Sequence, residues 1–537
     1  MCWKYQEERG EFIRCKASAV ATVMICTTAV VAAGGATTVG VASASSNRAG
    51  VTHAAHGQYP YRLINLGTLG GPNSAPDDPG ISISQNGVVV GSSDTPALNP
   101  FPGDPGCLES KPCHVNDAFE WRNGVMTDLG ALAGYSAGLF EVNRAGVGVG
   151  VSETGVLDPL TKSPEVHAVI AHGNRLIDLG TLGGNESWAS SINDEGQVAG
   201  YASNTTADSY LKNTNLYPSA TQVNAVIWQG GKVRDLGTLG GPDSIGSFIN
   251  NHGQVAGWSF TNGKPNSDSK VPTLDPFLWE NGHMIDLGTL GGDVGFSNWM
   301  NDSGEVVGFS ETAKDKSAQP FLWDGRRMID LGTLGGAGGS ANWINDNGDV
   351  AGAAQLSDGD WNGVLWTHGK TIDLPPVDGT PQAIANSLND QNEVVGSAED
   401  TKFNNLDAVL WTAGSAYDLN ALIAPSALHL KEAFYISDNG EIACYGSLAN
   451  GDTRVALLIP NNSVSLPPAA AAGPRPTTDS GDGGATALKL AAAGRGDLAF
   501  TGLQQLTAKQ EVIGETHGQR QHAQPPADAQ QQVIRLI

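Results

Sequence analysis

The sequence predicts an all-β chain that forms an eight-bladed β-propeller with four strands in each blade. Three observations support this prediction. A seven-residue motif, DLGTLGG or a close variant, recurs between about Tyr61 and Pro460. Short apolar runs follow each copy, separated by turns rich in Gly, Asn and Asp, and none has a helical period. The chain of 537 residues contains 70 Gly and only 16% charged residues, which suits a turn-rich β protein.

The repeated motif fixes the length of the structural unit. Clear copies occur at Asn65–Gly71, Asp178–Gly184, Asp235–Gly241, Asp286–Gly292 and Asp330–Gly336, and worn copies begin at Asp128, Asp373 and Asp418. A period of about 45 to 50 residues lies in the range of propeller repeats. In such proteins the recurring residues build the scaffold, and function is carried by what differs between copies.

Each unit is predicted to contain four strands, A to D. Strand A ends with an apolar residue, and an Asn-Asp-x-Gly turn follows, as at Asn193–Gly196. Strand B is a Val-rich run such as Gln254–Gly257, strand C is a run such as Phe277–Trp279, and strand D resembles His283–Leu287. The apolar residues that end strand A are Ile83, Val142, Ile192, Ile249, Met300, Ile344, Leu388 and Ile436.

The two ends of the repeat region predict how the ring closes. It opens with a lone D-type strand, Tyr61–Leu66, and ends with a lone C-type strand, Arg454–Ile459. We expect these strands to share the eighth blade, because an open array would leave two exposed sheet edges. Gly recurs eight residues after the end of strand A, as at Gly257, which indicates close backbone approach. Cys444 takes this position in the last unit, where we expect a small buried thiol.

These residues carry a family resemblance. The unit A-F-L-W-x-x-G-x-M-x-D-L-G-T-L-G-G, followed by I-N-x-x-G-x-V-V-G, resembles the extracellular repeat of the HAF family over about Tyr61–Pro460. The His-Ala-Phe that names the family is degraded here: Val166–Val169 is the nearest copy, and Asp117–Phe119 and Asp275–Phe277 depart further. The resemblance implies a bacterial, exported protein and implies no particular reaction.

The regions outside the repeats divide the chain into four parts. Residues 1–44 resemble an export signal, with a basic segment, an apolar run at Ala19–Ala33 and a cleavage site at Ala42–Ala44. Its acidic residues are atypical, and a start codon further downstream would explain them. Gly and Thr interrupt the run, which disfavours a membrane anchor, so we expect no stable insertion after signal removal. Residues 45–60 form a short linker, 61–460 the propeller, and 461–537 a disordered low-complexity tail.

Cysteine and metal-binding patterns are sparse. Cys107 and Cys113 lie in a loop rich in Pro and Gly, and an exported location favours a disulfide between them over a metal site. The eleven His form no zinc-hydrolase pattern, and neither a nucleophile elbow nor a phosphate-binding loop stands out. We therefore assign no catalytic residue, no metal ligand and no cofactor, although the acidic composition permits Ca²⁺ binding.

Charge excludes one class of partner. The chain holds 55 Asp and Glu against 30 Lys and Arg, a net charge of −25. Nucleic-acid phosphates require a basic surface, so we expect no nucleic-acid partner. Anionic membrane surfaces are disfavoured for the same reason. We expect a monomer that is secreted to the cell exterior.

Comparison of the units locates a variable segment between strands B and C. The intervals Gly91–Trp121, Gly150–Ala171, Gly200–Trp228 and Gly257–Trp279 span 30, 21, 28 and 22 residues, whereas the last four span 14 or 15. The long B–C loops are Ser92–Asp117, Val151–Val166, Ala202–Val223 and Trp258–Asp275. Loops on a rigid scaffold often carry function, although drift in surface loops explains the lengths equally well. The candidate ligand contacts are Phe101, Asp104, Asp208, Tyr210, Tyr217, Trp258 and Phe260.

The sequence leaves three functions open. The first is a non-catalytic binding or adhesion module whose long loops grip a glycan or an exported protein. The second is a polysaccharide lyase or hydrolase, and the third is a structural cell-surface protein. Aromatic residues also occur near the end of strand A, where we favour packing between blades over a sugar-binding channel. They are Phe248, Trp299, Trp343 and Tyr435.

Overall fold

A computed structural model describes residues 2–7, 10–15, 58–76, 80–101, 108, 112–159, 163–208, 221–266, 272–313, 317–377, 379–401 and 404–468. These residues contain no α-helix, and the prediction of an all-β chain built from four-stranded antiparallel sheets is confirmed. Strands β1 (Cys2–Glu7) and β2 (Gly10–Cys15) pair with each other. Residues 16–57 of the predicted signal and linker, and residues 469–537 of the predicted tail, lie outside the described residues.

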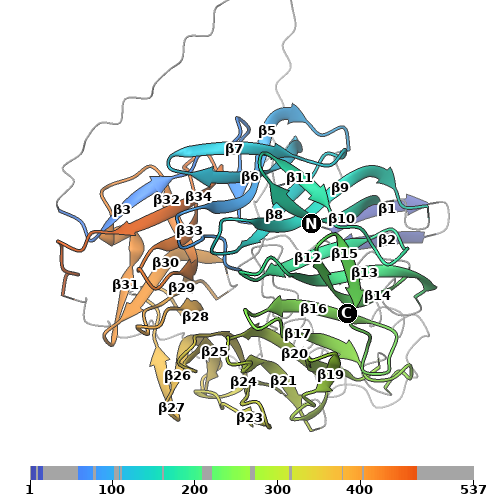
Figure 1. Cartoon of the computed structure of the whole chain (residues 1–537). Helices are drawn as coiled ribbons and strands as arrows, with labels where there is room; N and C mark the ends of the chain where they lie inside the picture. Colours follow the sequence, from blue (N-terminus) through green and yellow to red (C-terminus); the bar gives the residue numbers. More distant parts are fainter. Residues whose placement is uncertain are drawn as a thin grey trace, which may run out of the picture.

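The strands from β3 onward form eight four-stranded units, here numbered sheets 1 to 8 (Figure 1). In sheets 1 to 7 the four strands follow one another in the chain as A, B, C and D. Sheets 1 and 2 comprise β4 (Ser74–Ala75), β5 (Val89–Leu98), β6 (His114–Arg122), β7 (Val125–Gly130), β8 (Ala137–Val142), β9 (Gly148–Leu157), β10 (Pro164–His172) and β11 (Arg175–Asp178). Sheets 3 and 4 comprise β12 (Ser187–Ile192), β13 (Val198–Ala207), β14 (Thr221–Gln229), β15 (Lys232–Asp235), β16 (Ser244–Ile249), β17 (Val255–Phe260), β18 (Leu274–Glu280) and β19 (His283–Asp286).

The second half of the chain repeats this order. Sheets 5 and 6 comprise β20 (Gly291–Met300), β21 (Val306–Thr312), β22 (Ala318–Trp323), β23 (Met328–Asp330), β24 (Gly335–Ile344), β25 (Val350–Leu356), β26 (Trp361–Thr367) and β27 (Lys370–Leu374). Sheet 7 comprises β28 (Gln382–Leu388), β29 (Val394–Glu399), β30 (Asn405–Thr412) and β31 (Ser415–Asp418), and a 3-10 turn follows at Leu419–Leu422. One parallel pair, Leu274 with Val294, links sheets 4 and 5.

Sheet 8 contains strands from both ends of the described repeats. Its first three strands are β32 (His429–Ile436), β33 (Ile442–Ser447) and β34 (Thr453–Pro460). The fourth is β3 (Tyr61–Asn65), which pairs antiparallel with β34, from Tyr61 opposite Pro460 to Asn65 opposite Ala456. In Figure 1 the blue strand β3 accordingly lies beside the orange strands of the C-terminal sheet. The predicted pairing of the first and last strands is therefore present.

The contact between sheets 8 and 1 repeats the contact between sheets 2 and 3. In the latter, the backbone N–H groups of Val166 and Ala168 donate to Glu186 Oε2 and Ser187 Oγ, at 3.1 and 2.9 Å. The equivalent donors on β34 are the N–H groups of Thr453 and Val455. Their acceptors, Asn73 Oδ1 and Ser74 Oγ, lie at 3.0 and 3.1 Å.

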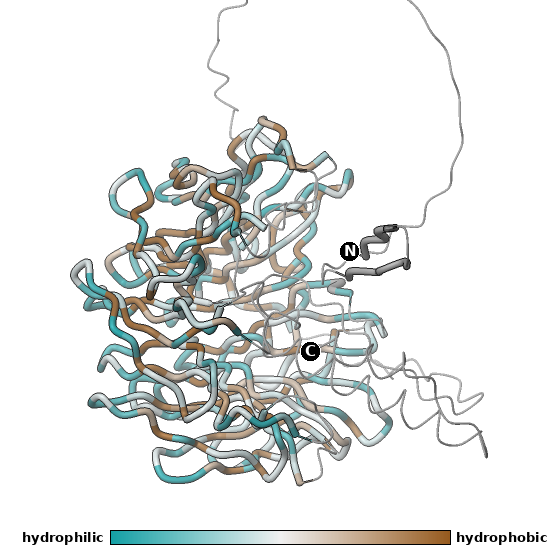
Figure 2. Tube along the Cα trace, turned by 90° about the vertical axis from the view of Figure 1, so that its right-hand side faces the viewer, coloured by the Kyte–Doolittle hydropathy of each residue, from teal (hydrophilic) through white to brown (hydrophobic). Residues whose placement is uncertain are grey.

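The hydrophobic core lies between neighbouring sheets. Phe277 of sheet 4, which is fully buried, packs with Ile227 of sheet 3, and Phe321 of sheet 5 packs with Leu278 of sheet 4. Buried residues of sheet 1 pack in the same way against Phe434 of sheet 8. Hydrophilic residues occupy many of the turns at the ends of the strands (Figure 2). Each sheet is therefore stabilised mainly by its neighbours.

The DLGTLGG motif forms a hydrogen-bonded turn from strand D to the next strand A. Asp178 Oδ1 accepts the N–H of Gly180 at 2.7 Å, and Thr181 Oγ1 donates to the carbonyl of Gly184 at 2.8 Å. Gly180 and Gly183 have φ values of 77° and 102°, a left-handed region that favours Gly. The same bonds recur in the other clear copies. The motif is therefore scaffold, as the sequence indicated.

The Gly of strand B is required by the close approach of strand A. A Cβ atom on Gly257 would lie 1.9 Å from the carbonyl oxygen of Ile245, and Gly200, Gly308 and Gly396 meet equivalent oxygens at the same distance. Cys444, the counterpart in sheet 8, is a buried free thiol. Burial raises the pKa of this thiol, so it remains protonated. Both expectations for this position are confirmed.

The loops between strands B and C are shorter than the sequence predicted, because part of each segment belongs to a strand. In sheets 1 to 3 strand B extends to ten residues, so β5 continues to Leu98 and β9 continues to Leu157. Ser92 and Ser93, placed in a loop by the sequence, pair with Ala118 and Asp117 in the ladder. The apparent loop bounds were therefore wrong because antiparallel pairing continues past the buried part of each strand.

Candidate functional site

The candidate contacts proposed from the sequence do not come together as one site among the described residues. Phe101 follows β5, is 49% exposed, and meets the ring edge of Tyr135 with centroids 5.7 Å apart. Asp208 follows β13 and is buried. Asp104, Tyr210 and Tyr217 lie outside the described residues, so their role stays a prediction.

Trp258 and Phe260 require a correction. The sequence placed them at the start of a loop, but β17 continues through both, and they are only 3% and 2% exposed. Trp258 packs against the rings of Phe296 and Phe260, at centroid distances of 5.6 and 6.1 Å. Both belong to a hydrophobic cluster between sheets 3, 4 and 5. They are core residues, because the inward face of strand B is covered by the neighbouring sheet.

Only one of the two cysteines of the predicted disulfide, Cys113, is among the described residues. Cys113 is buried and disulfide-bonded. Cys107 lies outside the described residues, so the pairing of Cys107 with Cys113 stays a prediction.

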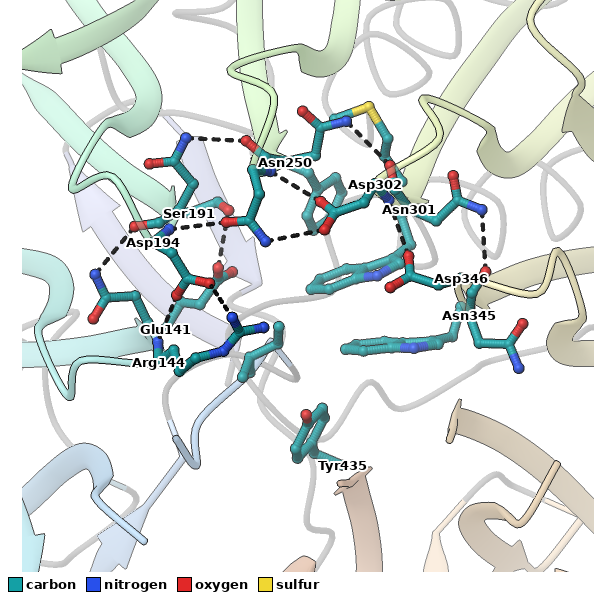
Figure 3. Close-up of a pocket in the computed structure, with 18 of the residues that line it drawn as sticks. Glu141, Arg144, Ser191, Asp194, Asn250, Asn301, Asp302, Asn345, Asp346 and Tyr435 are labelled. Atoms are coloured by element: carbon teal, nitrogen blue, oxygen red, sulfur yellow. Dashed lines mark hydrogen bonds and ion pairs between the residues drawn. The ribbon is translucent and has the colours of Figure 1, made fainter. Parts of the chain in front are cut away.

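A central pocket lies at the other end of the strands from the B–C hairpins. It has a volume of about 230 Å³ and is lined by the ends of strand A and the A–B turns from all eight sheets. Figure 3 shows side chains from different sheets converging on this pocket. Because its lining comes from every repeat, differences between the repeats decide its chemistry.

A β-bulge in strand A precedes one residue in each of sheets 2 to 8, and six of these seven residues line the pocket. In sheets 2 to 8 the pairing of strands A and B shifts by one residue just before the end of strand A. Such a bulge redirects the residue that follows it. We call this residue the inner residue of its sheet. The inner residues are Glu141, Ser191, Phe248, Trp299, Trp343, Ser387 and Tyr435.

One side of the pocket is aromatic. The rings of Trp299 and Trp343 stack with centroids 3.8 Å apart and an interplanar angle of 16°. Phe248 packs against Trp299 at 4.6 Å, and Tyr435 against Trp343 at 5.6 Å. All four side chains line the pocket, and Figure 3 shows the two stacked indole rings with Tyr435 beneath them. These rings form a continuous apolar wall contributed by sheets 4, 5, 6 and 8.

The inner residues of sheets 2 and 3 make another part of the pocket polar. Ser191 Oγ donates to Glu141 Oε1 at 3.0 Å, and the N–H of Ile192 donates to the same oxygen at 3.3 Å. Glu141 is 4% exposed, and burial raises the pKa of its carboxyl to about 8, although these two hydrogen bonds oppose the shift. Within the described residues only Oε1 has hydrogen-bond partners, which leaves Oε2 for a ligand.

A ladder of Asn side chains holds the A–B turns in place around the pocket. Nδ2 of Asn193 donates to the carbonyl of Asn250 at 3.0 Å, and Nδ2 of Asn250 donates to the carbonyl of Asn301 at 3.2 Å. The same bond links each turn to the next from Asn143 to Ser437. The Asn of the repeated turn therefore acts between sheets as well as within its own turn.

The residue after this Asn forms the rim of the pocket. In sheets 3, 5, 6, 7 and 8 it is an Asp, and in sheets 2 and 4 it is Arg144 and Asn251. The Asp and Asn side chains of the rim accept the backbone N–H of the preceding rim residue, as when Asp302 Oδ1 accepts from Asn251 at 2.9 Å. Partial burial, together with Asp438 and Asp346, raises the pKa of Asp390. The rim carboxylates are therefore close enough to repel one another.

One variable position of the repeat corresponds to this pocket. The residue before the apolar end of strand A differs between copies, from Glu and Ser to Phe, Trp and Tyr, while its neighbours repeat. We interpreted the four aromatic residues as packing between blades. They do stack between sheets, but they also line a pocket, because the bulge that redirects them leaves no mark in the sequence.

No protein-family model matches the sequence, and no curated protein matches it. Several solved structures resemble part of the fold. TolB from Acinetobacter baumannii matches with a TM-score of 0.29 and 8% identity, over 58% of this chain and 63% of its own. An acylaminoacyl peptidase from Pyrococcus horikoshii matches with a TM-score of 0.32 and 12% identity, over 72% and 59%.

The polysaccharide lyase Uly1 matches with a TM-score of 0.34 and 7% identity, over 74% of this chain and 92% of its own. The chain thus spans less than two thirds of the TolB and peptidase structures. Similarities of this extent do not define a shared function. None of the described residues forms a helix long and apolar enough to span a membrane, and none of their His, Cys, Asp and Glu side chains form a metal-binding group of three.

Proposed function

We propose that this chain is an eight-bladed β-propeller, closed between β3 and β34, that binds a glycan in its central pocket without catalysis. The closure is supported by the bonds from β34 to Asn73 and Ser74, which repeat those between sheets 2 and 3. It is also supported by a pocket lined from all eight sheets. The HAF resemblance and export from a bacterial cell are part of this proposal.

The observation that carries the proposal is the pairing of an aromatic wall with a buried polar pair in one pocket. The apolar C–H groups of a sugar ring pack on aromatic side chains, and Trp343 and Tyr435, whose ring centroids lie 5.6 Å apart, both line the pocket. The hydroxyl groups around the ring require hydrogen-bond partners, which Glu141 and the rim amides supply. A pocket of about 230 Å³ fits one sugar unit of a chain rather than an extended polymer.

Binding is favoured over turnover by the placement of the carboxyl groups. Glycoside hydrolysis ordinarily needs two carboxyl groups on opposite sides of the bond that is cleaved. Among the described residues that line the pocket, Glu141 is the one buried carboxyl, and the Asp side chains lie at the rim. A lyase or hydrolase, and a structural surface protein, remain the alternatives that the experiment below separates.

The test is a titration of soluble oligosaccharides followed by tryptophan fluorescence and calorimetry. We expect a neutral or basic oligosaccharide to change the fluorescence and to bind with a Kd in the micromolar to millimolar range. Trp343→Phe should weaken binding at least fivefold. Trp366→Phe is the matched control, since Trp366 is a buried Trp of the same sheet that does not line the pocket.

Three results would contradict the proposal. If no member of the panel binds, the structural alternative is favoured. Equal loss in Trp343→Phe and Trp366→Phe would place the effect in stability rather than in the pocket. Turnover of a polysaccharide that Glu141→Gln abolishes would favour the enzyme. Export is tested separately, by the N-terminal residue of the protein recovered from the medium, which we expect to follow Ala44.

A further inference from the structure

The rim of the central pocket carries a net negative charge on one side only. Consecutive sheets 5 to 8 supply Asp302, Asp346, Asp390 and Asp438, and all four line the pocket. Sheets 5, 6 and 8 also supply the inner residues Trp299, Trp343 and Tyr435, so the four carboxylates and most of the aromatic wall come from the same side of the pocket.

The remaining part of the rim is close to neutral. Its residues are Gln85, Arg144, Asp194 and Asn251. Arg144 Nη1 lies 3.4 Å from Asp194 Oδ2, so the one basic residue among the described lining residues is paired with the one Asp in this part of the rim. No positive charge among the lining residues therefore offsets the four carboxylates on the side of the aromatic wall.

A buried polar group inside the pocket adds a further hydrogen-bonding group for the sugar. Glu141 lines the pocket, and only 4% of its surface is exposed. Its Oε1 is held by Ser191 and Ile192, while Oε2 has no hydrogen-bond partner within the described residues. Burial raises the pKa of this carboxyl to about 8, so at pH 5.5 it is protonated, and Oε2 can donate its proton to a sugar hydroxyl oxygen.

We infer that the sugar bound in this pocket is an amino sugar that carries a free, positively charged amine. This inference rests on the proposed function and names the ligand class within it. The sugar ring packs on Trp343 and Tyr435, and its ammonium group faces the carboxylates of Asp346 and Asp390. Attraction between an ammonium and aromatic faces acts in the same direction as these carboxylates. Uronic acids and sulfated sugars are rejected by the same charges.

The rim can be neutralised without disturbing the fold. In sheet 4 the rim residue is Asn251, whose Oδ1 accepts the N–H of Asp194 at 3.0 Å, as the Asp residues do elsewhere. Asn at positions 346 and 390 therefore preserves the bond and removes the charge. Asp358→Asn is the matched control, because Asp358 lies in the exposed B–C turn of sheet 6, away from the pocket.

The experiment compares two probes that differ in one group, a glucosamine tetramer and its N-acetylated counterpart, at pH 5.5 in 20 mM and 200 mM salt. We expect wild-type protein to bind the glucosamine tetramer at least tenfold more tightly than the N-acetylated one at the lower salt concentration. In the double variant Asp346→Asn with Asp390→Asn this ratio should fall to about one. The control variant should keep the wild-type ratio.

The outcomes separate this inference from the proposed function. Equal binding of both tetramers, with sensitivity to Trp343→Phe, would overturn the amine preference and keep the glycan site. Absence of binding by both would overturn this inference, whereas the proposed glycan site would be overturned only if no member of the wider oligosaccharide panel binds. Preference for the glucosamine tetramer that survives in the double variant would also overturn the inference, because it would reflect the general negative charge of the protein. Circular dichroism of the double variant confirms that a loss of preference is not a loss of fold.

Discussion

Removal of Tyr61–Leu66 is the sharpest test of how the sheets are held together. These six residues contain β3, whose partner strand β34 lies almost 400 residues later in the chain. If the ring closes through this pairing, their loss exposes the edge of β34 and separates sheet 8 from sheet 1. If it does not, removing six residues near the start of the repeats changes little.

The expected magnitude follows from the burial of the deleted side chains. Tyr61 and Leu66 are 7% and 6% exposed, and both pack in clusters with residues of sheet 8. Full burial of a large apolar side chain contributes about 1.5–3 kcal/mol, so the two contribute about 3–6 kcal/mol. Ladder hydrogen bonds add about 1 kcal/mol each, which the ordering of each backbone residue roughly offsets. The expected loss is therefore about 3–6 kcal/mol, from a total that is about 5–15 kcal/mol for ordinary domains.

Urea denaturation followed by tryptophan fluorescence measures this loss. The two proteins to compare start at Tyr61, which keeps β3, and at Gly67, which removes it. We expect a lower urea midpoint and a stronger tendency to associate for the shorter protein, since an unpaired strand edge pairs with other chains. A difference in unfolding free energy below about 1 kcal/mol would refute the closure and the reasoning behind it.

Three further predictions follow from other parts of the fold. Gly257→Val should lower the unfolding free energy by about 3 kcal/mol or more, because its Cβ would meet a strand A carbonyl oxygen. A Cβ at Gly263 would meet no atom within 4 Å, so Gly263→Ala should change the unfolding free energy by less than about 0.5 kcal/mol. Urea titrations measure both changes. Burial and a neighbouring carboxylate raise the pKa of Asp275 to about 7. The folded state then binds the extra proton, so stability should fall as the pH rises from about 4 to about 7, and Asp275→Asn should flatten this dependence in unfolding curves measured at pH 5 and pH 8. Peptide mapping without reductant should recover Cys107 linked to Cys113, and free thiols at both positions would contradict the pairing.

Repetition made most of the fold predictable from the sequence. Eight copies of one motif gave the number of sheets, the strand count of each and the pairing of β3 with β34. The Gly of strand B was predicted for the correct reason, because a repeated Gly in a strand marks close backbone approach. The strand bounds near Leu98 and Leu157 were missed, since exposed residues in an extended hairpin have the same composition as a loop.

The candidate site was predicted less well than the fold. Loop length predicted ligand contacts in the B–C segments, but Trp258 and Phe260 of these segments are buried core residues. The inner residues were visible as a variable position, but which way a side chain points after a bulge depends on the register of two strands. Convergence of Glu141 and Trp343, two hundred residues apart, depends on the arrangement of whole sheets.

The structure suggests why function can vary within a scaffold this regular. The DLGTLGG turn, the strand B Gly and the Asn of the A–B turn are all committed to contacts that every sheet repeats. The inner residue makes its repeated contacts through backbone atoms of the strand ladder. The rim residue makes its repeated contact through its backbone N–H and through the Oδ1 atom that Asn and Asp both have. Their side-chain chemistry can therefore change without loss of the fold. On the proposed function, the inner and rim residues of sheets 2 to 8 determine which ligand the pocket accepts, and in this chain they combine aromatic rings with carboxylates on one side.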